Sequence, residues 1–181
     1  MNLPFDTLAP METGLRLHLE RMPADAPIEF RRITDREELG QLFTSCRATA
    51  RRVERPISHP FARPLRVHGV AARMDEYSNS NRGRFLALVD YFKSSADPVA
   101  LRLPAYRLAD GDALLLDGNH RATALWMSGL SVDVTLAMLC GPIDRRMLID
   151  LKYWDGGWRR FLNRIRWGTT SDRARQATHS S

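Results

Sequence analysis

The stretch Leu114–Leu125, which reads LLLDGNHRATAL, holds the side chains best suited to chemistry. It places an acid, a glycine, an amide, an imidazole and a guanidinium next to one another: Asp117, Gly118, Asn119, His120 and Arg121. The apolar residues before the acid predict a strand, and the residues after the glycine predict a helix that stops at Gly129. The first N–H groups of a helix lack intrahelical acceptors and lie at the positive end of its dipole. The turn therefore predicts a phosphate-binding site.

Each side chain of this turn has a candidate role. The expected nucleotide-binding residues are Gly118, Asn119, His120 and Arg121. Gly118 permits a tight turn and a close approach of a ligand to the backbone. Arg121 can grip a phosphate through two hydrogen bonds, and His120 is the first candidate for general acid/base catalysis because its pKa lies near neutrality. Asp117 completes the expected catalytic set: it caps the helix, which we favour, or it accepts a hydrogen bond from Arg121 and holds that side chain.

Residues 97–139 resemble the ParB/sulfiredoxin-like superfamily, which includes ParB-type nucleases. The resemblance lies in the order of the elements: a PVxL strand, a second strand, the DGNHR turn, a helix, a glycine and a final strand. The resemblance implies an α/β (α+β) domain with a small mixed sheet, flanking helices and a turn that binds ATP or another nucleotide. A divalent metal ion such as magnesium is compatible with that chemistry. Asn119 stands where ParB-type proteins have a metal-holding acid and sulfiredoxins have a reactive cysteine. We therefore expect neither magnesium ligation from that position nor sulfinic-acid reduction.

The motif, the small size and the arginine-rich composition also resemble plasmid-encoded oncogenic-suppression and fertility-inhibition factors. That resemblance implies an ATPase and DNase that restrains conjugative or T-DNA transfer. The implied partners are a nucleotide, DNA and components of a type IV secretion or conjugation apparatus, and the implied location is the bacterial cytoplasm, with peripheral attachment at the inner membrane through a partner. Two alternatives remain open: a non-catalytic, nucleotide-switched module that binds DNA or a partner, and an immunity-type protein that has lost its ligand.

Further polar residues have open roles. A metal ion could use carboxylates whose spacing selects none of them: Asp117, Asp110, Asp112 and Glu76. The polar segment SNSNRG at residues 78–83 is either a plain connection or a loop whose neighbourhood reaches a phosphate through Asn79, Asn81, Arg82 or Arg84. Cys46 and Cys140 lack the spacing of a zinc site and indicate small buried residues.

Charge is unevenly distributed along the chain. The 181 residues carry a formal net charge of +6, and 25 of the 27 basic residues are arginine. Residues 141–181 alone hold nine basic and four acidic side chains. Because guanidinium groups suit phosphates, contact with a polyanion is one hypothesis, and solvated helix faces are the other. No apolar run is long enough for a membrane span, and the N-terminal residues do not resemble a secretory signal.

The pattern along the chain predicts one main domain with appended segments. We expect an N-terminal arm at residues 1–30, the ParB/sulfiredoxin-like domain at 31–140, basic helices packed on it at 141–167 and a disordered tail at 168–181. Periodicity and turn residues predict a long helix from Thr34 to Glu54, opened by a capping box of Thr34 and Glu37, and a helix around Phe85–Phe92. The predicted strands are Leu65–Val70, Val99–Leu103, Ala113–Leu116 and Val132–Leu139, with a helix at Arg121–Ser128 between the last two.

Overall fold

The structure is a computed structural model, and it describes residues 26–55, 62–95, 99–108 and 112–140. In this part of the chain, six strands form one mixed sheet in the order β1-β6-β4-β5-β2-β3. The elements are β1 (Ile28–Ile33), α1 (Arg36–Gln41), β2 (Phe43–Ala48), β3 (Arg63–Arg66), α2 (Val67–Ala72), a 3-10 turn η3 (Met74–Glu76), α3 (Asn79–Ser94), β4 (Ala100–Arg107), β5 (Ala113–Leu115), α4 (Asn119–Ser128) and β6 (Asp133–Leu139). The predicted α+β class, a mixed sheet with flanking helices, is confirmed.

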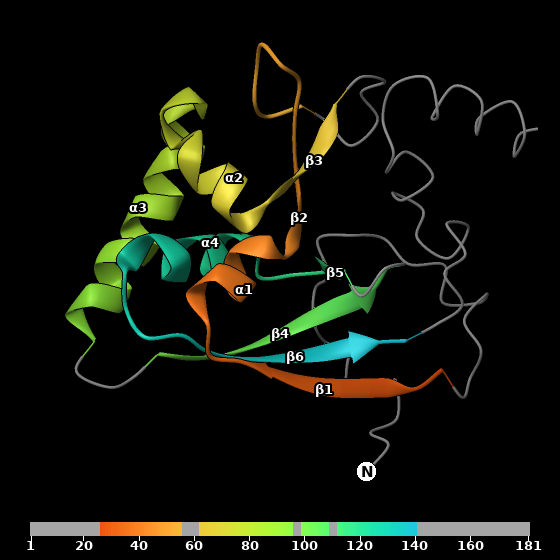
Figure 1. Cartoon of the computed structure of the whole chain (residues 1–181). Helices are drawn as coiled ribbons and strands as arrows, with labels where there is room; N and C mark the ends of the chain where they lie inside the picture. Colours follow the sequence, from red (N-terminus) through yellow and green to blue (C-terminus); the bar gives the residue numbers. More distant parts are fainter. Residues whose placement is uncertain (1–25, 56–61, 96–98, 109–111, 141–181) are drawn as a thin grey trace, which may run out of the picture.

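The four α-helices lie on one face of the sheet (Figure 1). Leu103 and Leu136 belong to the large buried cluster that also contains residues of α1, α3 and α4. Tyr106 and Leu114, which alternate along their strands with residues of that cluster, form a second buried cluster on the opposite face. Since both faces carry buried apolar side chains, the central strands β4 and β5 are fixed in register from two sides.

The N-terminal boundary differs from the prediction. Strand β1 pairs antiparallel with β6, from Ile28 opposite Leu139 to Ile33 opposite Val134, so the boundary expected at residue 30 falls inside a strand. The arm before residue 26, the basic helices expected at 141–167 and the tail expected at 168–181 lie outside the described residues. Among the residues that the structure describes, no helix is both long and apolar enough to span a bilayer.

The long helix predicted from Thr34 to Glu54 is wrong. Helix α1 ends at Gln41, and the next segment is strand β2, which pairs antiparallel with β3 and parallel with β5. The sequence FTSCRA combines aromatic and β-branched residues, which suit a strand that has partners on both sides. The helical spacing of its apolar residues is therefore overridden by tertiary pairing. The cap also shifts by one residue, because the side chain of Asp35, and not Thr34, accepts from the N–H of Glu37.

Two further boundaries are corrected. The strand expected at Leu65–Val70 divides into β3, which ends at Arg66, and helix α2, which begins at Val67. The turn expected at residues 78–83 is the first part of helix α3, with Ser78 at its N-cap position.

The later elements follow the sequence pattern closely. The apolar stripe of α3 is confirmed, because Phe85, Val89 and Phe92 are buried against the core. Gly129 ends α4 in the left-handed region at φ +73°, as a C-terminal glycine should. Strand β6 then runs parallel to β4, with Leu101 opposite Val134. The DGNHR turn consequently lies between the end of β5 and the start of α4, as predicted.

Candidate functional site

Gly118 shapes the turn that leads into helix α4. Its backbone lies in the left-handed region, at φ +75° and ψ 17°. A Cβ added there would lie 2.4 Å from Cδ2 of Leu103 and 3.3 Å from Nη2 of Arg121. Glycine is thus required both by the backbone conformation and by the space. The same short distance shows that the Arg121 guanidinium lies directly beside the Gly118 backbone, at the N-terminal end of the helix.

Helix α4 presents backbone donors at this point. The N–H of Ala122 donates to the carbonyl of Gly118 at 2.8 Å, which closes the first turn of the helix. The preceding N–H groups, those of residues 119–121, belong to the first turn, where no intrahelical acceptor exists. No side chain caps them within the described residues. Free N–H groups and the positive end of the dipole together favour an anion here.

Asp117 holds Arg121 and does not cap the helix. Its Oδ2 accepts from Nη2 of Arg121 at 3.0 Å, a pair separated by one helical turn. The role favoured from the sequence, capping, is therefore wrong, and the alternative is confirmed. The Asp117 and Arg121 side chains are 35% and 41% exposed, so a ligand can reach the guanidinium. An exposed ion pair of this kind contributes little stability, but it fixes the direction of the arginine.

His120 packs its ring on Phe85 of helix α3. The two ring centroids are 4.5 Å apart and the planes are tilted by 35°. Partial burial lowers the pKa of His120, the nearby Arg84 cation lowers it further, and Asp117 opposes both effects. The lowered pKa favours the neutral imidazole, which is the form that can accept a proton. It is half-buried and not sealed in the interior.

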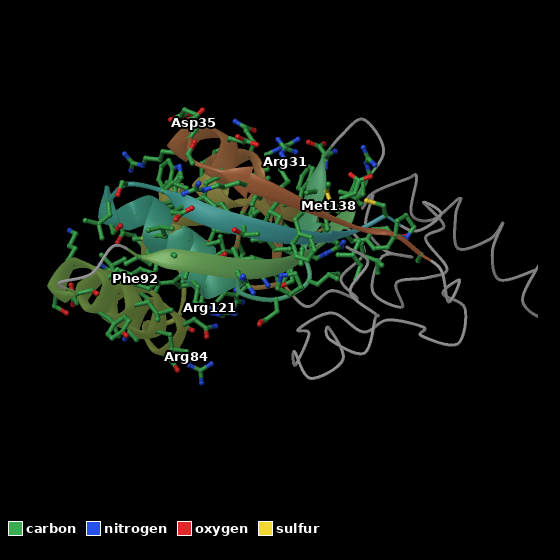
Figure 2. The ribbon with its side chains drawn as sticks, turned by 90° about the horizontal axis from the view of Figure 1, so that it is seen from below. Arg31, Asp35, Arg84, Phe92, Arg121 and Met138 are labelled. Atoms are coloured by element: carbon green, nitrogen blue, oxygen red, sulfur yellow. The ribbon has the colours of Figure 1, made fainter. Side chains whose placement is uncertain are left out.

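Arg84 adds a second cationic group to this region. It is exposed on α3, one residue before Phe85, and its charge acts on His120. Arg84 and Arg121 lie on the same side of the molecule (Figure 2). The hypothesis that residues near SNSNRG reach a phosphate therefore applies to Arg84. Asn81 instead donates to Glu54 at 2.6 Å, and Arg82 pairs with Asp75 at 3.0 Å.

The side chain of Asn119 has a structural role that the sequence did not reveal. It is buried, and its Oδ1 accepts from the backbone N–H of Ser45 at 3.0 Å. This bond attaches the start of α4 to strand β2. The Asn119 side-chain oxygen is thus engaged within the fold. Neither the Ser45 contact nor the packing of Phe85 on His120 had a signal in the sequence, since both join segments far apart in the chain.

The remaining carboxylates considered for a metal are engaged elsewhere. Both oxygens of Asp112 accept from Arg66, at 3.1 and 3.2 Å, and both oxygens of Glu76 accept from Arg73, at 2.9 and 2.7 Å. Asp110 lies outside the described residues. Within the part of the chain that is described, no three His, Cys, Asp or Glu residues gather into a metal-binding group. At the turn itself, the Asp117 carboxylate, which also accepts from Arg121, is the group that could contact a magnesium ion arriving with nucleotide phosphates.

The two cysteines are also placed by the structure. Cys46 on β2 and Cys140 after β6 are both half-buried free thiols, so the expectation of full burial is met only in part. Burial raises the pKa of both thiols, which disfavours the reactive thiolate.

Comparison with known proteins adds no relative: no protein-family model, curated protein or solved structure matches the chain. The resemblance to the ParB/sulfiredoxin-like superfamily therefore stays a prediction from the DGNHR motif.

Proposed function

We propose that the chain is a nucleotide-binding phosphoester hydrolase, acting on ATP and on DNA, whose phosphate site is the turn at Asp117–Arg121. One observation carries the proposal: the Arg121 guanidinium is held by Asp117 beside the uncapped N-terminus of α4, next to a half-buried imidazole whose pKa is lowered. A cation, backbone donors and a proton acceptor at one place are the parts that phosphoryl transfer requires. The proposed restraint of conjugative or T-DNA transfer rests on the resemblance alone.

In the proposed reaction, the first N–H groups of α4 and the Arg121 guanidinium bind the phosphate oxygens. Arg84, on helix α3, adds a second positive charge near His120. His120 accepts a proton from the attacking water, whose oxygen bonds to phosphorus as the P–O bond to the leaving group, ADP or a sugar oxygen of DNA, breaks. A lowered pKa suits this role because the ring must be neutral to act as the base. A magnesium ion brought by the nucleotide would supply charge neutralisation, with Asp117 as its protein contact.

ATP hydrolysis tests the proposal directly. Phosphate release is measured for the wild-type chain with ATP, with and without magnesium. His120→Gln should lower kcat by about 10²- to 10⁴-fold, the usual contribution of a general base, and should retain nucleotide binding. Arg121→Gln should weaken binding as well, and Arg121→Lys should restore little, because an ammonium lacks the planar fork. Arg102→Gln, on the exposed side of β4, is the matched control and should behave as wild type.

Thermal stability separates binding from catalysis. ATP at about one hundred times its Kd should stabilise the native state by about 2.7 kcal/mol, which raises Tm by roughly 5–10 °C for a chain of this size. Stabilisation without turnover would instead support the non-catalytic, nucleotide-switched module. That alternative has one observation in its favour, the commitment of Asp117 to Arg121. If no nucleotide stabilises the protein and none is hydrolysed, both the hydrolase and the nucleotide-switched module are rejected. The remaining alternative is then a protein that has lost its ligand.

A further inference from the structure

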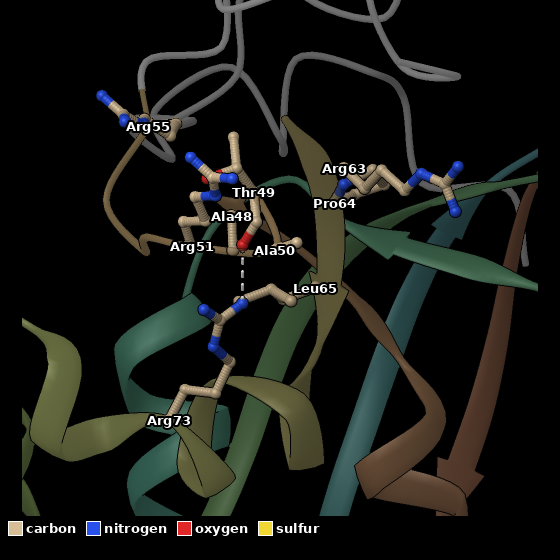
Figure 3. Close-up of a pocket in the computed structure, with 9 residues that line it drawn as sticks. All are labelled: Ala48, Thr49, Ala50, Arg51, Arg55, Arg63, Pro64, Leu65 and Arg73. Atoms are coloured by element: carbon tan, nitrogen blue, oxygen red, sulfur yellow. Dashed lines mark hydrogen bonds between the residues drawn. The ribbon is translucent and has the colours of Figure 1, made fainter. Parts of the chain in front are cut away.

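A second basic region lies at the outer edge of the sheet, in a pocket of about 890 Å³ between the loop after β2 and strand β3 (Figure 3). The lining residues are Ala48, Thr49, Ala50, Arg51, Arg55, Arg63, Pro64, Leu65 and Arg73. None of them belongs to the DGNHR turn. The volume is near the upper end of the range of about 300–1,000 Å³ that encloses a whole small ligand, so it greatly exceeds the needs of a single phosphate.

Four arginines and no acid line this pocket. Arg73 forms an ion pair with Glu76 and donates to the carbonyl of Thr49 at 3.1 Å. These two contacts hold its side chain in place in the pocket lining. Arg51 and Arg63 are exposed, and no ion pair among the described residues includes either of them. Nε of Arg55 is buried without a hydrogen-bond partner in the described part of the chain. Among the described residues, the pocket therefore has two arginines without an acidic partner and one buried donor without an acceptor.

We propose that this pocket binds the phosphodiester backbone of a nucleic-acid strand. The guanidinium groups of Arg55 and Arg63 lie on opposite sides of the pocket and do not converge on one point (Figure 3). That spread suits successive phosphates along a strand, whereas one compact anion would need converging donors. The lining between the arginines is largely apolar, formed by residues such as Ala48, Pro64 and Leu65. Sugars and bases can pack on such a surface, and inorganic polyphosphate has no apolar part to place there.

The position of the pocket relates it to the turn. Strands β2 and β5 are parallel, with Phe43 opposite Leu114, so the segments that follow them leave the sheet at the same edge. The loop after β2 is also attached to helix α3, because Oε1 of Glu54 accepts from Ser78 and Asn81. The loop that lines the pocket is therefore connected to the start of α3, the helix that also carries Arg84. The pocket binds nucleic acid whether or not the turn is catalytic.

The test measures binding of the full chain to a fluorescein-labelled 20-nucleotide single strand by fluorescence anisotropy over a range of salt concentrations. The double variant Arg51→Gln with Arg63→Gln removes two phosphate contacts. Each contact contributes about 0.7 to the slope of log K against log salt, so the slope should decrease by about 1.4, and Kd should rise about tenfold at about 0.15 M salt. Arg32→Gln with Arg102→Gln, on the sheet face opposite the helices, removes the same charge elsewhere and should change the slope much less.

Equal losses in both double variants would overturn the proposal, since charge alone would then explain binding; unchanged binding in the pocket variant would overturn it too. A labelled duplex is measured in parallel, and a specific loss with either form supports the pocket. Inorganic polyphosphate of matched charge should compete less well than an unlabelled oligonucleotide, and equal competition would contradict the assignment to nucleic acid.

ATP hydrolysis by the pocket variant should equal that of wild type. If the wild-type chain hydrolyses no ATP but its nucleic-acid binding depends on the pocket arginines, only the proposed hydrolase is rejected. If it hydrolyses ATP but its nucleic-acid binding does not depend on these arginines, only the pocket proposal is rejected.

Discussion

Gly118→Ala should destabilise the protein and disable the turn at once. A non-glycine residue in the left-handed region costs about 1–2 kcal/mol. The new Cβ would also lie 2.4 Å from Leu103 Cδ2 in the core, and forcing a methyl group into packed space costs about 1–3 kcal/mol more. The expected loss in the free energy of unfolding is therefore about 2–5 kcal/mol, measured by urea unfolding followed by circular dichroism.

Gly129→Ala is the matched control for this change. Gly129 has nearly the same φ, +73°, but nothing lies within 4 Å of a Cβ added there. It should lose only the conformational part, about 1–2 kcal/mol, so the two variants should differ by about 1–3 kcal/mol. Because the added Cβ at residue 118 also contacts Arg121, only Gly118→Ala should lose stabilisation by ATP. Equal destabilisation by both variants would refute the argument that space, as well as backbone conformation, demands glycine at the turn.

Three further changes test neighbouring features. Gly83→Ala, inside α3 with open space around it, should stabilise the protein by about 0.5–1 kcal/mol in urea unfolding, and a destabilisation would contradict a helix at that position. Arg84→Gln removes a cation that lowers the pKa of His120, so NMR titration of the imidazole should show a higher pKa, and an unchanged value would mean that Arg84 does not act on the ring. Asn119→Ala leaves the N–H of Ser45 without its acceptor and should cost about 1–3 kcal/mol of unfolding free energy; a neutral result would dismiss that bond as a structural tie.

Local signals were sufficient for the second half of the described chain. The apolar triplet before Asp117, the stripe of α3 and the stop at Gly129 each depend on neighbours in sequence, and the structure has all three. Gly118 also makes the tight turn that its conformational freedom permits. Such features are predictable because strand, turn and helix preferences act in the same direction there.

The first half was not predictable in the same way. Residues 43–48 carry apolar side chains at helical spacing, yet they form β2 because β3 and β5 supply hydrogen bonds that a local pattern cannot represent. The same limit applies to the site. Asn119 is bound to Ser45, and Phe85 lies on His120, through contacts between distant segments. The arginine pocket also depends on distant segments, since Arg51 and Arg63 come together with Arg73 only when β2 and β3 pair.

The pairing between β2 and β5 has a consequence for how the sheet opens. Strands β4 and β6 are in register from Ala100 to Tyr106, whereas β2 meets β5 at Phe43 opposite Leu114. The β2–β3 pair is therefore joined to the rest of the sheet by little backbone pairing. Its amides should exchange with deuterium well before those of the inner strands. A nucleic acid bound across β2 and β3 should slow deuterium exchange of their amides. Binding would thus make this edge of the sheet more rigid.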